Sequence, residues 1–402
     1  NVKAQNKPAT MKHFDAIIIG AGQAGVPLSK KLAMAGKTTA IIEKRLIGGT
    51  CINDGCTPTK AMIASAKIAY QASKSASLGV EIGSIKIDLK KIIARKDEIV
   101  EQFRSSSEEG IEKTKGLKLY MGEARFSGKK EITIALENGK EEVITADWIF
   151  INTGAKTAIP EIEGLRDINY LTSTSILELE EVPEHLLVVG ANYIGLEFGQ
   201  MFSRFGSKVT ILEKSDSILA REDKDVSAAL LEILEAEKID VITNTEVLKF
   251  SAAKKNGINV EYRSGMVFRN LSITHVLIAT GRIPQTEALS LGECGINVDE
   301  KGYIVVNNKL ETNIKGVYAL GDVKPGPAFT HLAYNDYTIV YRNLMEGTNY
   351  NIKDRPIPYC MFTDPQLGRV GISEEEAKAQ KLDYQVAVLP MANVARGIET
   401  GE

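Results

Sequence analysis

The chain has 402 residues, with 49 lysines and arginines against 52 aspartates and glutamates, and a net charge of −3. At roughly 150 residues per domain, this length predicts two to three domains. The near balance of charge excludes an overall electrostatic attraction to nucleic acid or to an anionic membrane surface. No stretch approaches the roughly 20 apolar residues of a membrane span. We therefore expect local binding sites, with no nucleic-acid partner and no membrane association.

The cysteine usage is not that of a small secreted protein. Four cysteines in a chain of this length do not make a disulfide framework. The N-terminus lacks a long apolar segment and a small-residue cleavage site, so we interpret the residues before Met11 as a leader remnant or a cloning scar and expect a cytoplasmic location. Cys294 and Cys360 stand alone and are expected to be inert, small hydrophobic residues. Cys51 and Cys56, by contrast, are only five residues apart.

An internal repeat relates residues 18–44 to residues 188–214, with an offset of 170 and no gap. Each copy reads as an apolar strand, a glycine-rich turn, a helix-length stretch, a glycine and a second apolar strand. An acid follows 23 residues after the first glycine of each copy. This order predicts a βαβ unit in both copies.

The glycine-rich turn of the first copy has the pattern of a dinucleotide site. Gly20, Gly22 and Gly25 allow the backbone to turn tightly and to approach a pyrophosphate at a helix N-terminus. The acid, Glu43, can accept hydrogen bonds from ribose hydroxyls. A single such pattern is often only a tight turn, but two copies in register favour dinucleotide binding.

The second copy carries Gly190, Gly195 and Glu213 at the matching positions, with Asn192 where a glycine is expected. The carboxylate of Glu213 can accept hydrogen bonds from both ribose hydroxyls of NADH, but it would meet the 2′-phosphate of NADPH with like charge. We therefore predict NADH as the preferred cofactor. Lys214 is the adjacent cation that could partly offset this repulsion.

The cysteine pair follows soon after the first copy. Residues beyond it have helical spacing, and Thr57 and Pro58 suit the N-cap and the first position of that helix. Cys56 would then lie beside a helix N-terminus, which lowers the pKa of a thiol, and Lys60 adds positive charge. A redox-active pair of Cys51 and Cys56 is favoured over an inert buried pair and over a metal half-site, so we expect no metal.

Two apolar runs that end in Thr-Gly, 148–154 and 276–281, border the second copy. They are predicted to carry the chain into and out of an inserted domain. We predict a first dinucleotide domain from 11–152 and 282–349, a second from 153–281, and the start of an α+β module over 350–402. In that module, Ser373 and Glu376 have the spacing of a helical capping box. Two dinucleotide sites in one chain favour electron transfer between a flavin and a nicotinamide.

These motifs resemble a known family. The glycine turn of the first copy, the Gly-Gly-Thr-Cys-x4-Cys-x-Pro-x-Lys run of 48–60, the two Thr-Gly strands and the segment 316–322 are similar to the FAD-dependent class I pyridine nucleotide-disulfide oxidoreductases. The branch of mercuric reductase and dihydrolipoamide dehydrogenase is the most similar. The resemblance covers nearly the whole chain from Met11. It implies an α/β fold with two Rossmann-like dinucleotide-binding domains, for FAD and NAD, plus an incomplete α+β C-terminal interface domain.

The resemblance also implies residue roles. Cys56 would face the flavin as the charge-transfer thiol, Cys51 would exchange with substrate, and Lys60 would pair with Glu197 near the flavin N5; these four are the expected catalytic residues. Glu43 would bind the adenosine ribose of FAD and Asp322 its ribityl chain. The expected cofactor-binding residues are Gly20, Gly22, Gly25, Glu43, Lys44, Thr50, Lys60, Thr153, Gly154, Gly190, Tyr193, Ile194, Gly195, Glu213, Gly281, Gly321 and Asp322.

Members of this family end in an interface domain that supplies a His-Glu pair to the partner subunit. No His-Pro-Thr segment follows His331 in this sequence, so we expect 350–402 to be a partial interface domain and the protein to be a homodimer when that domain is complete. The implied substrate is a small molecule or ion. A mercuric-reductase-like reduction of a disulfide or Hg(II) is favoured, and dihydrolipoamide dehydrogenase is the alternative. An alternative of another class is a flavin redox sensor or binding protein without steady turnover.

Overall fold

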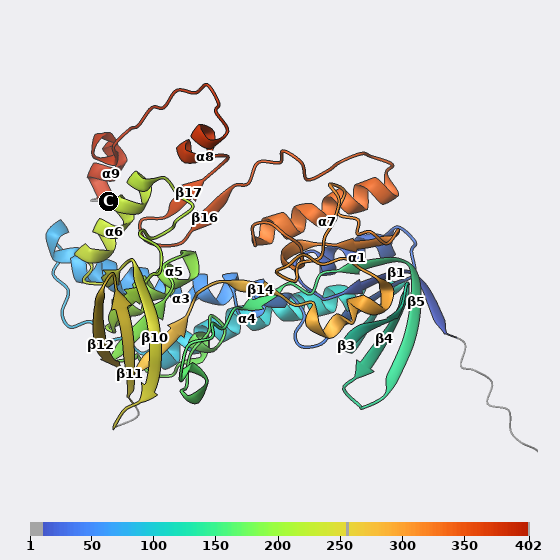
Figure 1. Cartoon of the computed structure of the whole chain (residues 1–402), viewed down its shortest axis with the longest axis horizontal. Coiled ribbons are helices and arrows are strands. Elements are labelled where there is room, and N and C mark those ends of the chain that lie inside the picture. The colour runs from blue at the N-terminus through green and yellow to red at the C-terminus, as the bar shows by residue number, and fades with distance from the viewer. Residues whose placement is uncertain (1–10, 255–256, 401–402) are drawn as a thin grey trace, which may run out of the picture. The chain divides into compact units, whose positions relative to one another are not determined.

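The computed structural model of the chain describes residues 11–254 and 257–400, so the predicted leader remnant before Met11 lies outside the described residues. The chain divides into two compact units, and Figure 1 shows their helices and strands. The first unit comprises Asn1–Ala61, Ala94–Ala158 and Gly281–Arg355. The second comprises Met62–Ile93, Ile159–Thr280 and Pro356–Glu402.

Within the described residues, the first unit contains a six-stranded mixed sheet. Its strands are β1 (Lys12–Ile19), β2 (Thr39–Glu43), β3 (Leu117–Gly128), β4 (Glu131–Leu136), β5 (Glu141–Ile151) and β15 (Val317–Ala319). Strand β1 pairs in parallel with both β2 and β5, as expected of a βαβ unit. Strands β3, β4 and β5 form an antiparallel meander, and β15 adds in parallel to β5. A short antiparallel pair, β6 (Ala155–Thr157) with β14 (Arg282–Pro284), also belongs to this unit.

Both faces of β1 are buried, which explains its continuous apolar sequence. Ile17 and Ile19 pack in one cluster with strand β4. Ile18 packs on the opposite face against Leu28 of α1 (Gly25–Met34) and in the same cluster as Tyr337 of α7 (Thr330–Met345). The helices α1 and α7 contact each other on that face, as Figure 1 shows. The glycine turn between β1 and α1 thus joins the end of a buried strand to a helix that is packed on the sheet.

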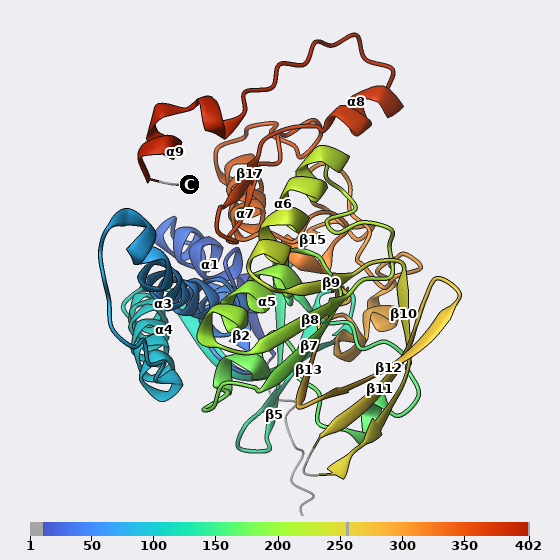
Figure 2. The ribbon, with the colours of Figure 1, turned by 90° about the vertical axis from the view of Figure 1, so that its left-hand side faces the viewer.

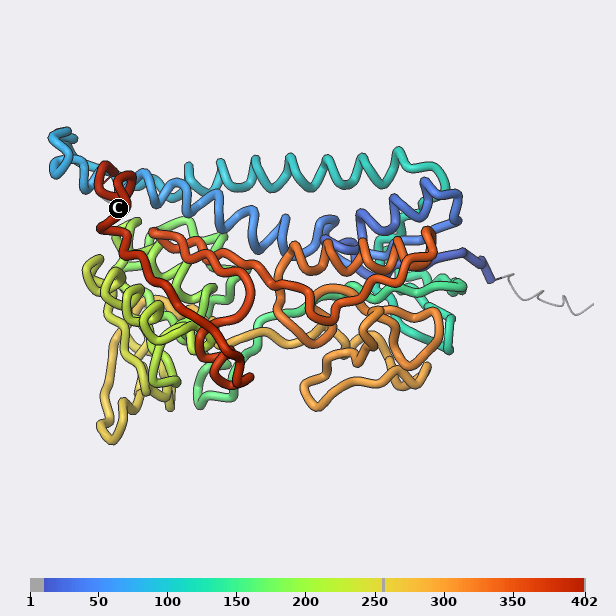
Figure 3. The backbone as a smooth tube through the Cα atoms, turned by 90° about the horizontal axis from the view of Figure 1, so that it is seen from above, coloured from blue at the N-terminus to red at the C-terminus, as the bar shows by residue number. Residues whose placement is uncertain are grey.

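The cysteine pair lies in a helical region. The short helix α2 spans Gly49–Asn53, and α3 spans Cys56–Lys74. The helix α4 (Leu89–Glu112) is one long, uninterrupted helix in Figure 3. Both α3 and α4 cross the division between the two units, at 61/62 and 93/94.

The second unit has a parallel sheet in the order β13-β7-β8-β9, visible in Figure 2. Its strands are β7 (His185–Val189), β8 (Lys208–Leu212), β9 (Asp240–Ile242) and β13 (His275–Ile278), and its helices are α5 (Tyr193–Phe205) and α6 (Lys224–Ala236). An antiparallel sheet of β10 (Thr245–Ala252), β11 (Ile258–Ser264) and β12 (Val267–Ile273) accompanies it. The C-terminal part of the unit adds the pair β16 (Tyr359–Met361) and β17 (Leu367–Arg369), with α8 (Glu374–Ala379) and α9 (Ala395–Thr400).

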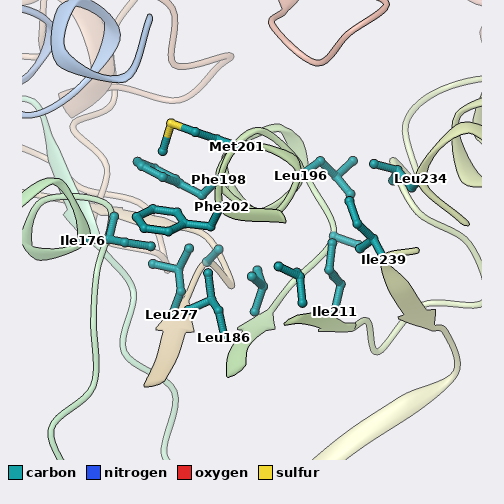
Figure 4. Close-up of a cluster of buried hydrophobic side chains, with 14 of the residues drawn as sticks. Ile176, Leu186, Leu196, Phe198, Met201, Phe202, Ile211, Leu234, Ile239 and Leu277 are labelled. Carbon is teal, nitrogen blue, oxygen red and sulfur yellow. The ribbon is translucent and has the colours of Figure 1, made fainter. Parts of the chain in front are cut away.

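One face of α5 packs on the parallel sheet of the second unit. In Figure 4, Phe198 and Phe202 of α5 lie over Leu186 of β7 and Leu277 of β13, and all four side chains are buried. Burial of a large apolar side chain contributes about 1.5–3 kcal/mol. This cluster therefore fixes α5, and with it the turn that precedes α5, on the sheet.

The predicted α/β class is confirmed, and so is the helix at the Ser373 capping box: Ser373 accepts from the N–H of Glu376, whose side chain accepts from the Ser373 N–H. The division into units differs from the predicted boundaries at 62–93 and 356–402, which group with the second unit.

The predicted start of the helix after the cysteine pair was wrong by two residues. Helix α3 begins at Cys56 itself, and the N–H of Thr59 already bonds to the carbonyl of Gly55, so Thr57 lies inside the first turn and does not cap it. No described helix is long and apolar enough to cross a membrane.

Candidate active site

The glycine turn of the first unit leaves no room for side chains at two positions. A Cβ on Gly20 would lie 2.4 Å from the carbonyl oxygen of Asn152, and Gly20 has a φ of +101°. A Cβ on Gly25 would lie 2.1 Å from the carbonyl oxygen of Gly20. Carbon and oxygen normally stay about 3.3 Å apart or more. Only glycine therefore fits at either position.

The same turn offers hydrogen-bond donors at the start of α1. The N–H groups of Gly22, Gln23 and Ala24 have no acceptor among the residues that the structure describes, and the N-cap residue Ala24 has no side chain that could cap the helix. Free N–H groups and the helix dipole together attract an anion. The turn therefore fits the pyrophosphate of a dinucleotide cofactor.

The acid at the end of β2 is held by the backbone. One oxygen of Glu43 accepts from the N–H of Ala21 at 2.9 Å, and the other accepts from the N–H of Arg45 at 2.9 Å. Each carboxylate oxygen keeps a second lone pair for a ribose hydroxyl. Lys44, which was also predicted to bind cofactor, lies 3.5 Å from the carboxylate of Glu123.

The second copy reproduces these contacts 170 residues later. A Cβ on Gly190 would lie 2.5 Å from the carbonyl of Ala279, and one on Gly195 would lie 2.0 Å from the carbonyl of Gly190. The two oxygens of Glu213 accept from the N–H groups of Ala191 at 2.7 Å and Ser215 at 2.8 Å. The repeat seen in the sequence is therefore also a repeat of hydrogen bonds.

The two copies differ where Asn192 replaces a glycine. The side-chain oxygen of Asn192 accepts from the N–H of Tyr193 at 2.8 Å and so caps α5. One donor at the start of α5 is therefore already occupied by a side chain. Ile194 and Gly195 follow in the first turn of the helix.

None of the four cysteines forms a disulfide bond in this structure. Cys51 is half-buried in α2, and Cys56 is exposed at the first residue of α3. A hydrogen bond with Cys56 and burial raise the pKa of the Cys51 thiol above its usual range. The hydroxyl of Thr330, the first residue of α7, lies 3.3 Å from the Cys56 sulfur.

The segment that holds the thiols is tied down by polar contacts. Asp54, between α2 and α3, forms an ion pair with Arg45 at 2.7 Å. The side-chain amide of Asn53 donates to the carbonyls of Ile47 and Gly49, and its oxygen accepts from Arg104 of α4. The predicted site residue Thr50 belongs to α2, and its carbonyl accepts from the N–H of Asp54.

A second turn of the first unit carries Gly321 and Asp322. Burial raises the pKa of Asp322. The N–H of Gly321 donates to Asp336 of α7 at 2.9 Å. Asp336 is fully buried and also forms ion pairs with Lys324 at 3.1 Å and Arg355 at 2.7 Å. This carboxylate therefore fixes the turn on which Asp322 lies.

The remaining predicted residues lie at the chain crossings and on the two units. Thr153 and Gly154 hydrogen-bond to Gln285 within the first unit: the Thr153 hydroxyl donates to the Gln285 carbonyl, and the side chain and backbone N–H of Gln285 donate to the carbonyls of Thr153 and Gly154. Gly281 accepts from the N–H of Ala158. In the second unit, Glu197 is buried and accepts from the N–H of Phe362 at 2.8 Å.

Residues 14–336 match the profile of the family described as pyridine nucleotide-disulphide oxidoreductase, and residues 357–402 match its dimerisation domain. The chain belongs to this family. Among its relatives, mercuric reductase of Staphylococcus aureus is 35% identical over 390 residues, with 97% of this chain and 70% of the relative covered. Dihydrolipoyl dehydrogenase 2, mitochondrial, of Arabidopsis thaliana is 33% identical, with 96% and 77% covered.

A solved structure gives the same result. The Cu(II) complex of the HOCl-induced flavoprotein disulfide reductase RclA from Escherichia coli has a TM-score of 0.88 and 35% identity, with 97% of this chain and 84% of that chain covered. The protein is therefore an FAD-dependent flavoprotein of the pyridine nucleotide-disulfide oxidoreductase family, as the sequence motifs predicted.

Sequence reasoning missed three residues of the oxidoreductase that contact predicted site residues. Thr330 lies against Cys56, Asn152 contacts Gly20, and Asp336 holds Gly321. Asn152 precedes one of the Thr-Gly pairs and so had a sequence signal. Thr330 and Asp336 had no such sequence signal. Thr330 lies 274 residues from Cys56 in the chain, and Asp336 lies 15 residues from Gly321.

Proposed function

We propose that this oxidoreductase passes electrons from NADH through FAD to the Cys51/Cys56 pair, and from this pair to Hg(II) or a disulfide. The observation that carries the proposal is the unequal pair itself: a half-buried Cys51 whose pKa is raised, beside an exposed Cys56 at a helix start. The similarity to mercuric reductase supports Hg(II) as the first acceptor to test.

Residues of the first unit fit FAD. The glycine turn of Gly20, Gly22 and Gly25 would hold its pyrophosphate, Glu43 its ribose, and Asp322 its ribityl chain. When bound, FAD supplies the exchange of two electrons between a nicotinamide and a dithiol. The second unit would hold the nicotinamide cofactor through the equivalent residues. The assignment of one dinucleotide cofactor to each unit is supported by the repeat, because Glu43 and Glu213 make the same pair of backbone hydrogen bonds.

The chemistry of the cysteine pair can be written from its own atoms. Two electrons and two protons convert a Cys51–Cys56 disulfide into two thiols. The Cys51 thiol then gives up its proton, its sulfur attacks a substrate disulfide to form a mixed disulfide, and the displaced thiolate takes up a proton and leaves as one thiol. The Cys56 thiolate attacks the Cys51 sulfur, releases the second thiol and closes the pair again. A hydrogen bond from Thr330 to Cys56 would stabilise the thiolate that this last step needs.

Lys60 and Glu197 complete the proposed catalytic set. Lys60 is on α3 in the first unit, four residues after Cys56, and Glu197 is on α5 in the second unit. Their pairing near the flavin is a proposal that rests on the family motif. A partner subunit would complete the site in a homodimer, which the match to the dimerisation domain supports. We also propose a cytoplasmic location, supported by the low cysteine content.

The proposed preference for NADH rests on Glu213. Its carboxylate is held in place by two N–H groups, and it would repel the 2′-phosphate of NADPH. Lys214 is drawn to another carboxylate, that of Glu246 at 3.6 Å, which leaves it less able to offset this repulsion. We expect a kcat/KM at least about tenfold higher with NADH, or ~1.4 kcal/mol. Glu213→Ala should lower the ratio of kcat/KM with NADH to kcat/KM with NADPH. A tenfold preference of the unchanged protein for NADPH would refute the role assigned to Glu213.

The acceptor is tested by mixing the FAD-loaded protein with NADH and Hg(II), Cu(II), lipoamide or no acceptor. Sustained NADH oxidation with Hg(II), lost in Cys51→Ser, is the expected result. Turnover with lipoamide alone would instead favour the dihydrolipoamide dehydrogenase function, for which the 33% identity to the Arabidopsis enzyme is the supporting observation. A single flavin reduction with no turnover on any acceptor would identify a redox sensor.

A further inference from the structure

One face of α5 carries polar residues that are buried instead of exposed to solvent. Glu197, Gln200 and Arg204 follow one another at spacings of three and four, so they lie on one side of the helix. Glu197 is 4% exposed, Gln200 3%, and the Arg204 side chain 4%. The other side of α5 packs into the apolar cluster of Figure 4. Burial of three polar side chains is costly unless each is hydrogen-bonded, so their partners matter.

The partners lie in the segment 362–364, which follows β16. Glu197 accepts from the N–H of Phe362 at 2.8 Å. The side-chain oxygen of Gln200 accepts from the N–H of Asp364 at 2.8 Å, and its nitrogen donates to the Asp364 carbonyl at 2.9 Å. The polar face of α5 therefore binds the backbone of this segment at two residues.

Ion pairs hold the same segment through the side chain of Asp364. Arg204 donates to the Asp364 carboxylate at 2.8 Å and makes two bonds, of 2.8 and 2.7 Å, to Glu237. Lys67 of α3 lies 3.2 Å from the other oxygen of Asp364. Burial acts to raise the pKa of Asp364, but hydrogen bonds from Arg204 and Lys67 outweigh it and lower that pKa. Asp364 is therefore ionised and held on both oxygens.

We propose that Gln200, Arg204 and Asp364 form a clamp that holds the Phe362 N–H in place, and that this N–H positions the Glu197 carboxylate for its role in flavin reduction. The inference rests on the proposed function of Glu197. The three clamp residues are positioning residues. A Glu side chain on a helix has several rotamers, and a donor fixed outside the helix selects one of them.

A purely structural role would look different. If the clamp only anchored the segment 356–369 on α5, its loss would lower stability and slow flavin reduction. The factor by which reduction slows would then be the same with Glu197 and with glutamine at that position. If the clamp acts through Glu197, its loss matters only while the carboxylate is present. A double-mutant cycle separates these cases.

The experiment measures the rate of anaerobic flavin reduction by NADH in the FAD-loaded protein. Glu197→Gln keeps an acceptor for the Phe362 N–H but removes the charge, and it should slow reduction about tenfold or more. Asp364→Asn should slow it about tenfold, because a displacement near 1 Å can cost up to about 100-fold in rate. The same Asp364→Asn change in the Glu197→Gln background should add less than about twofold.

A milder variant keeps the test decisive if Asp364→Asn does not fold. Lys67→Met removes one contact to Asp364 from a side chain that is 42% exposed, and it should slow reduction about two- to threefold, again only while Glu197 is present. Lys249→Gln, which breaks the exposed pair with Glu163 in the same unit, is the matched control and should leave the rate unchanged.

A second readout needs no turnover. Hydrogen exchange of the Phe362 amide, followed in the peptide 359–364, should be faster in Asp364→Asn and Lys67→Met than in the unchanged protein or Lys249→Gln. Unchanged exchange would overturn the clamp. If Glu197→Gln reduces flavin at the normal rate, the proposed role of Glu197 fails and the inference falls with it. If Glu197→Gln is slow and Asp364→Asn adds its full factor, only the inference fails.

Discussion

Matched glycine substitutions in the two copies of the repeat should separate the two cofactors. Gly25→Ala places a Cβ 2.1 Å from the carbonyl oxygen of Gly20, and Gly195→Ala places one 2.0 Å from that of Gly190. A carbon–oxygen contact of roughly 3.3 Å is normal, so each turn must open by about 1.2–1.3 Å. The atoms on both sides are backbone, and the strand and helix around them are packed, so no flexible side chain can absorb the change.

The expected effect is selective. Such overpacking costs about 1–3 kcal/mol of stability, and the displaced N–H groups lose their alignment with a pyrophosphate. We expect Gly25→Ala to lower FAD affinity at least about tenfold, or ~1.4 kcal/mol, while NADH binding to the second unit persists. Gly195→Ala should retain FAD and its yellow colour but should be reduced by NADH much more slowly. FAD content from flavin absorbance and the rate of anaerobic bleaching give the two readouts.

Two other glycines serve as controls. Gly36 and Gly206 have φ of +83° and +109°, yet a Cβ at either meets nothing within 4 Å. Alanine there costs about 1–2 kcal/mol of backbone strain without moving a turn, so it should lower stability and leave cofactor binding intact. Normal FAD affinity of Gly25→Ala, or loss of FAD in Gly195→Ala with retention in Gly25→Ala, would refute the assignment of the copies.

Three further predictions concern single groups. Cys51→Ser should show a long-wavelength flavin–thiolate absorbance without reductant, because Cys56 can no longer form a disulfide, whereas Cys56→Ser should not. Thr330→Val in the Cys51→Ser protein should weaken this band, and Thr330→Ser should restore it. Equal spectra for both cysteine variants would contradict the distinct roles of the two sulfurs. Asp336→Asn leaves the buried Lys324 and the partly buried Arg355 without their carboxylate and should lower the free energy of unfolding by about 3 kcal/mol, measured by denaturant titration. A loss below about 1 kcal/mol would argue against a buried network. Burial lowers the pKa of His185 below its usual 6.5, so the unfolded chain takes up the proton first as pH falls, and the free energy of unfolding should decrease with falling pH from about 6.5 down to the folded-state pKa. A His185→Gln protein should lose that part of the pH dependence of Tm, and an identical pH profile would show that other groups control it.

The parts of the fold that follow local backbone rules could be predicted from the sequence. The spacing of Gly20, Gly25 and Glu43 fixes a turn, a helix and the end of a strand within 24 residues, and the structure keeps that geometry in both copies. The helix start was misplaced because proline is accepted at several positions of the first turn, where no N–H bond is needed. Thr57 and Pro58 therefore allowed two starts, and the helix begins at the earlier one, Cys56.

The buried polar contacts could not be predicted in the same way. Arg204 and Asp364 are 160 residues apart, and Thr330 and Cys56 are 274 apart. A single charged residue in a sequence is most often exposed, and nothing nearby in the chain marks these as exceptions. The grouping of 356–402 with the second unit depends on the same long-range bonds, so the sequence boundary at 350 could not anticipate it.

The asparagine that caps α5 has a consequence for how the two halves acquire order. A side-chain cap stabilises a helix start by about 1 kcal/mol. Helix α5 has such a cap from Asn192, whereas Ala24, at the N-cap of α1, provides none. The second copy can therefore complete its first helical turn from its own atoms as soon as the sheet forms. In the first copy no side chain caps that turn, so the N-terminal end of α1 should fray more than that of α5 when no anion is bound. We therefore expect the second copy to become ordered without a ligand, and the first copy to complete its helix start only when an anion binds there.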